Sequence, residues 1–187
     1  MEVFISSISK FKSIFEKLAS LKSEDRDGTL VVVSRDLMTI HIASSVSPNM
    51  RYAIENWNEV APKLRKLATK LEQGSVETKP YDPSKLESPL PRSFQWADGS
   101  AYLSHMRLVR KARGADMPPN SESEPLLYQG GGDHFLGPTD NILCSNPNWG
   151  LDFESEIAII TDDVPLGCSK VDASKHIKLV MLCNAIS

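Results

Sequence analysis

The sequence predicts an α+β protein in which a small N-terminal α/β domain is followed by a second, strand-rich part. Three observations support this prediction. Short β-branched runs precede residue 43, an apolar stripe with helical spacing occupies residues 50–71, and two apolar strands follow residue 150. The chain has 187 residues, which is enough for one domain or for a small domain with part of a larger one.

Composition and charge exclude several classes of protein. The chain is 41% hydrophobic and 24% charged, and its formal net charge of -3 offers no broad basic field for nucleic acid. No run approaches the roughly 20 apolar residues of a membrane span. Cys144, Cys168 and Cys183 are an odd number without CxxC spacing, which argues against a disulfide framework or a structural zinc site. We therefore expect a cytoplasmic protein with neither nucleic acid nor membrane as a partner.

The N-terminal segment has apolar residues spaced three and four apart, which predicts an extra amphipathic helix over residues 1–16. The segment lacks a continuous apolar region and a small-residue cleavage site, so a secretory signal is not expected. The stripe consists of Phe4, Ile5, Ile8, Phe11, Ile14, Phe15 and Leu18.

A small domain is expected over residues 17–76. Residues 30–33 and 38–42 predict a strand pair joined by a turn at residues 34–36. A helix is expected to follow, with Ser47 as its N-cap and Pro48 at its first position. Pro62 should divide or kink this helix, and Gly74 can close it. Its apolar stripe is Met50, Ile54, Trp57, Val60, Leu64, Leu67 and Leu71.

Residues 77–99 are rich in proline and show no periodicity, which predicts a linker to a second domain over residues 100–187. That part should begin with a short helix near residue 105, followed by a strand entering the glycine run at residues 130–132. The glycine run lacks the spacing of a phosphate-binding loop. It is better explained by a sharp turn or by a close approach of backbone to another segment.

The stretch GLDFESEIAIITDD, residues 150–163, predicts an amphipathic strand with two carboxylates in an apolar run. Alternation places Glu154 and Glu156 on one face and Phe153, Ile157 and Ile159 on the other. The apolar set can pack on a core while the acidic set faces water, a metal ion or a partner. Paired carboxylates suit Mg²⁺ or Ca²⁺, although solvated strands carry such pairs routinely.

The short helix near residue 105 carries the other candidate side chains. His105 is a candidate general base, and Tyr102, three residues earlier, should share its face. A lone histidine on a helix is more often structural or simply exposed. Basic residues on the same helix and at its end can bind a carboxylate or phosphate, or form a solvated face near the helix C-terminus. They are Arg107, Arg110, Lys111 and Arg113.

In this order the segments resemble the fumarylacetoacetate hydrolase (FAH) family, in particular its bacterial members with a small N-terminal domain. The likeness covers residues 17–187. It is carried by KLASLKSEDRDGTLVVVSRDL, APKLRKLATKLEQG, PLPRSFQWADGSAYLSHMRLVRKARGADMP, EPLLYQGGGDHFLGPTDNI and WGLDFESEIAIITDDVPLG. The resemblance implies that residues 100–187 form the first part of an FAH-type mixed β-roll.

The resemblance also implies a divalent-metal-dependent hydrolase or lyase of 2-oxo or diketo acids in aromatic-compound catabolism. Glu154 and Glu156 match the metal-binding glutamates of the family's E-x-E motif, and His105 matches the histidine that activates water. The ion acts as a Lewis acid toward the oxo acid. Tyr102 and Arg107 are the expected substrate-binding residues.

Two positions depart from the family's pattern. A glutamate that assists the histidine in some members falls at Leu108, and the third metal ligand, an aspartate, falls at Ala185. Binding of Mg²⁺, Ca²⁺ or Mn²⁺ is therefore expected to be weak or absent.

The chain ends at Ser187, where the family's chain would continue, so we expect a truncated member with little activity alone. The alternatives are a half-enzyme that needs a complementary chain and a non-catalytic binding module. Partners would be a small oxo acid and, since the family is usually homodimeric, a second copy.

Overall fold

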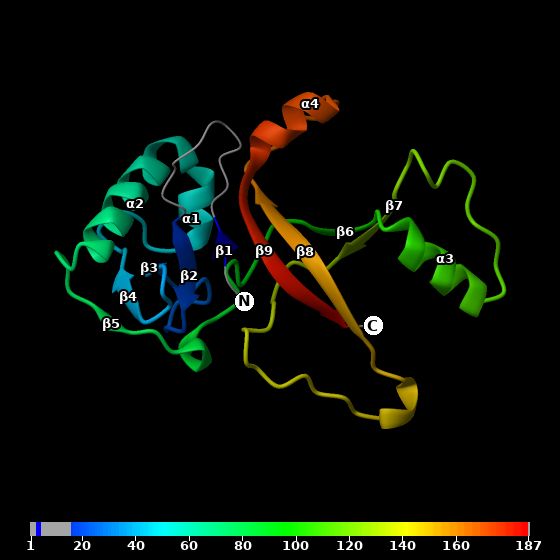
Figure 1. Ribbon diagram of the computed structural model, residues 1–187, viewed down its shortest axis with the longest axis horizontal. Coiled ribbons are helices and arrows are strands. Elements are labelled where there is room, and N and C mark those ends of the chain that lie inside the picture. The colour runs from blue at the N-terminus through cyan, green and yellow to red at the C-terminus, as the bar shows by residue number, and fades with distance from the viewer. Residues whose placement is uncertain (1–2, 5–15, 187) are drawn as a thin grey trace. The chain divides into compact units, whose positions relative to one another are not determined.

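The structure is a computed structural model that describes residues 3–4 and 16–186 (Figure 1). The chain divides into two compact units, residues 1–92 with 135–187 and residues 93–134, which we call the first and the second unit. Within residues 3–4 and 16–186, no helix combines the length and the apolar character that a membrane crossing needs. The predicted domain boundaries near residues 17, 77 and 100 stay a prediction.

The first unit is built on a seven-stranded antiparallel sheet with the order β5-β4-β3-β2-β1-β9-β8. Its strands are β1 (Val3–Phe4), β2 (Lys17–Leu21), β3 (Thr29–Val33), β4 (Thr39–Ile42), β5 (Lys79–Pro80), β8 (Phe153–Thr161) and β9 (Ile177–Ile186). Short helical turns are η1 (Pro83–Lys85), η2 (Pro147–Trp149), α4 (Lys170–Ala173) and η3 (Ser174–His176). β1 pairs with both β2 and β9, so strands from both ends of the chain share one sheet.

The predicted strand pair is confirmed as β3 and β4. The N-terminal helix prediction is wrong where the structure tests it, because Val3–Phe4 form β1 and the last member of the stripe, Leu18, lies in β2 opposite Val32. Leu18 fits both the helical spacing of the predicted stripe and the alternation of a strand, because it is apolar and fully buried in the sheet. The rest of that predicted helix, residues 5–15, lies outside the described residues.

The predicted helix is confirmed as two helices, α1 (Met50–Glu55) and α2 (Trp57–Glu72), but its cap is different. Asn49 is the N-cap, because its Oδ1 accepts a hydrogen bond from the Tyr52 backbone N–H at 2.9 Å. Ser47 instead donates from its hydroxyl to the backbone oxygen of Asn49. Gly74 closes α2 as predicted, with a φ of 65° that suits glycine.

The helix breaks at Asn56 and continues through Pro62, contrary to the prediction that Pro62 divides or kinks it. A proline inside a helix removes one backbone hydrogen bond, here to the carbonyl of Asn58. Asn58 and Pro62 both lie on the exposed side of α2, where water can satisfy that carbonyl. The apolar stripe is therefore kept in one line through the proline.

Both faces of the N-terminal strands are buried. Leu18, Leu30 and Val32 pack with the stripe of α1 and α2 in one core, while Ala19, Val31 and Val33 pack with Leu86 on the other face. Strands buried on both faces read as continuous apolar runs, which is what residues 30–33 show. Ile160 of β8 and Leu179 of β9 belong to the helix-side core.

A buried carboxylate ties three segments of the first unit together. Asp27, in the turn before β3, has a side chain that is only 3% exposed. Arg92 donates two hydrogen bonds to it, from Nε and Nη2 at 2.8 Å each, and Arg51 of α1 forms an ion pair with it at 2.5 Å. The hydrogen bonds from Arg92 are the main reason that the pKa of Asp27 is lowered.

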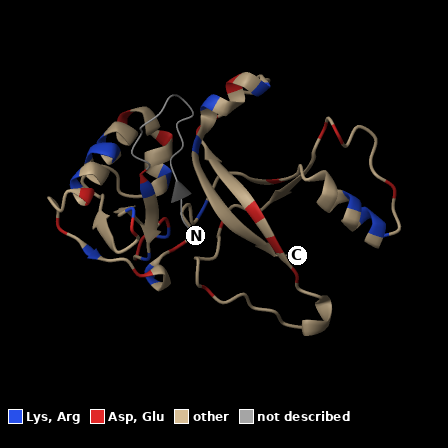
Figure 2. Cartoon of the chain, viewed as in Figure 1, with Lys and Arg blue, Asp and Glu red and all other residues tan. Residues whose placement is uncertain are grey.

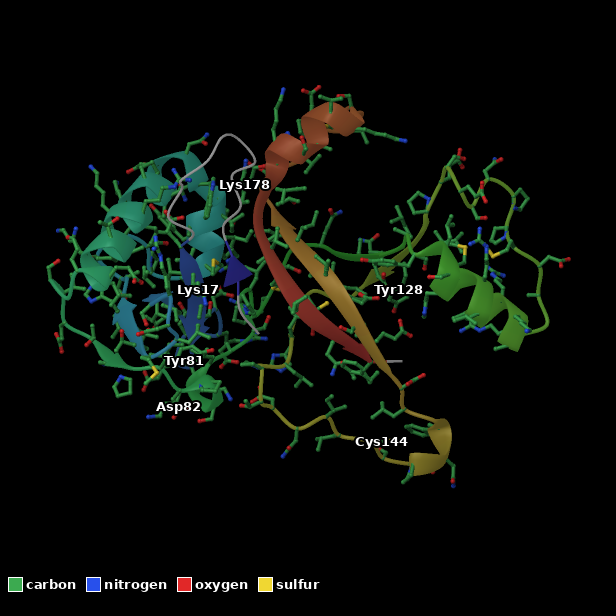
Figure 3. All side chains as sticks on the ribbon, viewed as in Figure 1. Lys17, Tyr81, Asp82, Tyr128, Cys144 and Lys178 are labelled. Atoms are coloured by element: carbon green, nitrogen blue, oxygen red, sulfur yellow. The ribbon has the colours of Figure 1, made fainter. Side chains whose placement is uncertain are left out.

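The second unit contains a two-stranded antiparallel sheet of β6 (Trp96–Ser100) and β7 (Leu126–Gly130), with α3 (Leu103–Ala112) between them in sequence. The predicted helix and the strand entering the glycine run are confirmed as α3 and β7. β6 was missed because it lies in the proline-rich stretch that predicted a linker. Tyr128 (labelled in Figure 3) packs edge-on against Trp96, with ring centroids 5.6 Å apart.

Close approach explains two of the three consecutive glycines. Gly130 pairs with Trp96 across the sheet, and a Cβ on Gly130 would overlap the indole ring. A Cβ on Gly132 would overlap the backbone oxygen of Ser93, whose N–H donates to the Gly132 carbonyl at 2.6 Å. A Cβ on Gly131 would meet only the carboxylate of Asp133, which can rotate away.

We expect Gly130→Ala to destabilise the β6–β7 hairpin by about 1–3 kcal/mol, because the new methyl displaces Trp96. Amide hydrogen exchange of residues 96–100 and 126–130 measures the effect as faster exchange. Gly131→Ala is the matched control and should leave those rates within about twofold of the parent, since a surface change of this kind shifts stability little. Equal acceleration in both variants would contradict the role given to Gly130.

Candidate functional site

The two candidate metal-binding glutamates lie on one face of the β8–β9 hairpin. The register pairs Glu154 with Ala185 and Glu156 with Cys183, so all four side chains share that face. Figure 2 shows the two acidic positions of β8 as separate red bands toward one end of the hairpin. We call this surface the glutamate face.

The glutamate face begins in the core and runs outward along the hairpin. Ile160 and Leu179 form its innermost pair and are 7% and 0% exposed. The next pair outward is Ala158 with Met181, which packs partly against the core. Glu156 and Glu154 follow at successive alternate positions and are half-buried.

The structure reverses one interpretation that the sequence allowed. The apolar set of β8 points outward, with Phe153, Ile157 and Ile159 at 63%, 60% and 50% exposed, and the acidic set lies on the side that reaches the core. Alternation correctly separated the two faces, but it did not say which one packs inward. Leu179 decides this, because it is fully buried and pairs with Ile160 rather than with Ile159.

Within the paired residues of β8 and β9, the glutamate face offers a hard cation two carboxylates, those of Glu154 and Glu156. Ala185 stands opposite Glu154 and has only a methyl group, and the thiol of Cys183 opposite Glu156 is a poor ligand for Mg²⁺ or Ca²⁺. In the part of the chain that the structure describes, no group of three or more His, Cys, Asp or Glu side chains is arranged to hold a metal ion. The residues present therefore do not fit a three-carboxylate metal centre.

The remaining predicted site residues belong to the second unit, at and on α3. Tyr102 is the N-cap of α3 with extended dihedral angles, so it precedes the helix instead of sharing a helical face with His105. His105 and Arg107 are exposed. Arg107 Nη2 lies 3.5 Å from Glu122 Oε1, a weak exposed pair that leaves the guanidinium accessible to an anion.

A second charged cluster lies at the opposite end of the β8–β9 hairpin. The sequence patterns did not reveal it. His176 Nδ1 lies 2.6 Å from Asp162 Oδ1, and Lys178 donates to Asp162 Oδ2 at 2.8 Å (Lys178 is labelled in Figure 3). Burial raises the pKa of Asp162, but the hydrogen bonds from Lys178 and His176 outweigh it and hold the pKa below its usual range. These residues are brought together by pairing of β8 with β9, which no local motif encodes.

Because the pKa of folded Asp162 is lowered, its contribution to stability is present above the unfolded pKa of about 3.9 and is lost as the pH falls through the folded value. We expect Asp162→Asn to lower the free energy of unfolding by about 1–2 kcal/mol at pH 7 and by progressively less below about pH 4. Urea unfolding at pH 7 and pH 3 measures both differences. A cost that stays constant across this range would contradict an ionic role.

Two family models match the chain and together cover nearly all of it. The Fumarylacetoacetase N-terminal domain 2 model matches residues 16–92, and the Fumarylacetoacetate (FAA) hydrolase C-terminal model matches residues 95–187. No curated protein matches the sequence. The glutamate face and α3 both lie in the region of the second model. The chain therefore belongs to the fumarylacetoacetate hydrolase family, as a member that carries the N-terminal domain as well as the hydrolase region.

Proposed function

We propose that this chain carries the divalent-cation site of its family in a weakened form and has little or no turnover of 2-oxo or diketo acids. The pairing of Glu154 with Ala185 is the observation that supports the proposal. Family members of this type generally depend on a divalent metal. A chain that offers two carboxylates where three are needed should bind Mg²⁺ or Mn²⁺ weakly.

In this proposal, the side chains that remain have distinct roles. Glu154 and Glu156 supply carboxylate oxygens on the glutamate face. His105 is the general base, by its match to the histidine that activates water in the family. Arg107 and Tyr102 bind the carboxylate of the oxo acid, the first by charge and the second through its hydroxyl. The assignments of His105 and Tyr102 rest on their match to the family pattern, and that of Arg107 rests on its place in the basic cluster of α3. Their exposure leaves all three accessible to a small acid.

We expect Ala185→Asp to strengthen Mn²⁺ binding by roughly tenfold or more, because affinity for hard cations rises with the number of charged ligands. The new carboxylate would stand directly opposite Glu154. Isothermal titration with MnCl₂ measures the change. Without metal, the same variant should unfold at a lower temperature than the parent, because three carboxylates then repel one another.

Asn184→Asp is the matched control, because it adds the same charge to the adjacent residue on the other face of β9. It should leave the Mn²⁺ affinity within about twofold of the parent, since a non-ligating charge on the far face adds only weak, screened attraction. If both variants bind Mn²⁺ more tightly by the same factor, the gain is a general charge effect and the glutamate face is not a metal site. If neither does, Ala185 does not occupy a ligand position.

A further inference from the structure

A buried carboxyl group lies immediately before β2, away from the candidate site. The side chain of Glu16 is only 1% exposed, although glutamate is rarely buried unless it is paired. Among the described residues, its Oε1 is the one buried side-chain oxygen or nitrogen atom without a hydrogen-bond partner. Such atoms are rare in folded proteins, because each has lost its hydration without a compensating bond.

Arg65 of α2 lies near this carboxyl group without satisfying it. Its Nε is 3.4 Å from Glu16 Oε1, which is within the range of an ion pair, but the two atoms form no hydrogen bond. The Arg65 side chain is 45% exposed, so water screens its charge. Among the described residues, Arg65 is the charged group that acts on Glu16. The adjacent Lys17 instead donates from Nζ to the backbone oxygen of Arg35 at 3.2 Å.

The balance of these effects favours the protonated form of Glu16. Burial raises the pKa of its carboxyl group, and the charge of Arg65 and the backbone N–H of Glu16 lower it by less. A neutral carboxyl group avoids the cost of taking an ion out of water. Asp27 shows the contrast, because Arg92 donates hydrogen bonds to it, Arg51 pairs with it, and its pKa is lowered.

Glu16 lies next to the place where the sheet joins the two matched regions of the chain. Lys17 and Leu18, the residues that follow it, pair with β3 on one side and with β1 on the other. β1 also pairs with Val180 and Met181 of β9. A displacement of Glu16 would therefore disturb the strand that connects the N-terminal strands to the β8–β9 hairpin.

We propose that Glu16 is a pH-sensitive switch: its protonated carboxyl group keeps the start of β2 in place, and its ionisation loosens the pairing of β1 with β2 and β9. An ionised Glu16 needs water around a side chain that is almost completely buried, so the start of β2 has to open to admit it. Glu16 lies in the region matched by the N-terminal model, and the switch does not depend on the metal site proposed above.

The raised pKa of Glu16 sets the direction of the pH effect. The stabilisation is complete below the ordinary value of 4.5 and is lost as the pH rises through the higher folded value. Asp27 and Asp162 act in the opposite sense, because their pKa values are lowered and their contributions are lost as the pH falls. A comparison with a variant that differs only at Glu16 removes the contributions of all other titrating groups.

Glu16→Gln tests the switch in the full chain, because glutamine resembles a protonated glutamate in size and shape. In urea unfolding between about pH 4.5 and pH 8, the midpoint of the parent should fall relative to that of Glu16→Gln as the pH rises. At pH 8, the amides next to β1 should exchange several-fold faster in the parent, while those of β4 exchange equally in both. The amides next to β1 are those of Lys17, Leu18, Val180 and Met181.

Arg65→Gln gives an independent reading, because it removes the charge that favours the ionised form of Glu16. This variant should lose more stability than the parent over the same rise in pH. Lys66→Gln is the matched control, since Lys66 is the exposed neighbour of Arg65 on α2, and its pH dependence should equal that of the parent.

Three results would overturn the switch. Parallel pH dependence of the parent and Glu16→Gln would show that folded Glu16 keeps no additional proton. A parent that is the more stable of the two at pH 8 would show that Arg65 holds Glu16 as an ion. A midpoint that depends on Glu16, with equal exchange of the amides next to β1, would show a buried acid that does not control the pairing of that strand.

Discussion

Asp27→Ala is expected to lower the free energy of unfolding of the first unit by about 2–4 kcal/mol. The substitution removes a bidentate pair with Arg92 and an ion pair with Arg51 from a carboxylate that is almost completely buried. Hydrogen bonds to charged groups are each worth about 1.5–3 kcal/mol. The two arginine side chains are 29% and 35% exposed, so they recover part of their hydration and the loss stays below the sum of the bonds.

Urea unfolding followed by circular dichroism at pH 7 measures the effect of Asp27→Ala. Glu59→Ala is the matched control, because Glu59 forms an exposed pair with Lys63 one helical turn away. Such a surface pair contributes less than about 0.5 kcal/mol. If the two variants lose similar amounts of unfolding free energy, Asp27 does not hold together the turn before β3, α1 and the segment that ends at Arg92.

Leu179→Ala is expected to lower the free energy of unfolding by about 2–5 kcal/mol, the usual range for truncation of a buried leucine to alanine. Leu179 is fully buried in the cluster that includes Leu18, Met50 and Leu64. It belongs to the region matched by the hydrolase model, whereas these three neighbours belong to the region matched by the N-terminal model. The substitution therefore tests whether both regions of the chain share one core.

Leu166→Ala is the control for this change, because Leu166 is a leucine of the same region that is fully exposed. It should alter stability by less than about 0.5 kcal/mol. The informative probe is the fluorescence of Trp57, which packs against the same core from α2. If Leu179→Ala weakened only β9 and left the Trp57 transition unchanged, the hydrolase region would not contribute to the N-terminal core.

The parts of the fold that follow from local spacing could be predicted from the sequence. The stripe from Met50 to Leu71 has the helical period over six turns, and it is the stripe that the helices bury. The strands β3, β4, β8 and β9 were predicted from short β-branched or apolar runs and, in β8, from alternation of apolar and polar residues. β2 was missed because residues 17–21 continue a helical pattern, and β6 because its weak alternation lies among prolines.

The parts that depend on tertiary pairing could not be predicted. Alternation in β8 separates two faces but does not choose the inward one, which is set by Leu179 on a strand about twenty residues away. Residues that are distant in sequence also form the cluster of Asp162, His176 and Lys178. The same holds for the ion pairs of Asp27 with Arg51 and Arg92. The register likewise pairs Ala185 with Glu154, while the match of Ala185 to a ligand position stays a prediction.

The most direct test of the metal-site account is a calorimetric titration of the unaltered chain with MgCl₂ and MnCl₂. A face with two carboxylates and an alanine in the third position should bind either ion only weakly, with a dissociation constant on the order of a millimolar or above. Turnover of 2-oxo and diketo acids should be correspondingly small in saturating metal. Micromolar binding that Glu154→Ala abolishes would contradict the account, because it would show a complete metal centre despite Ala185.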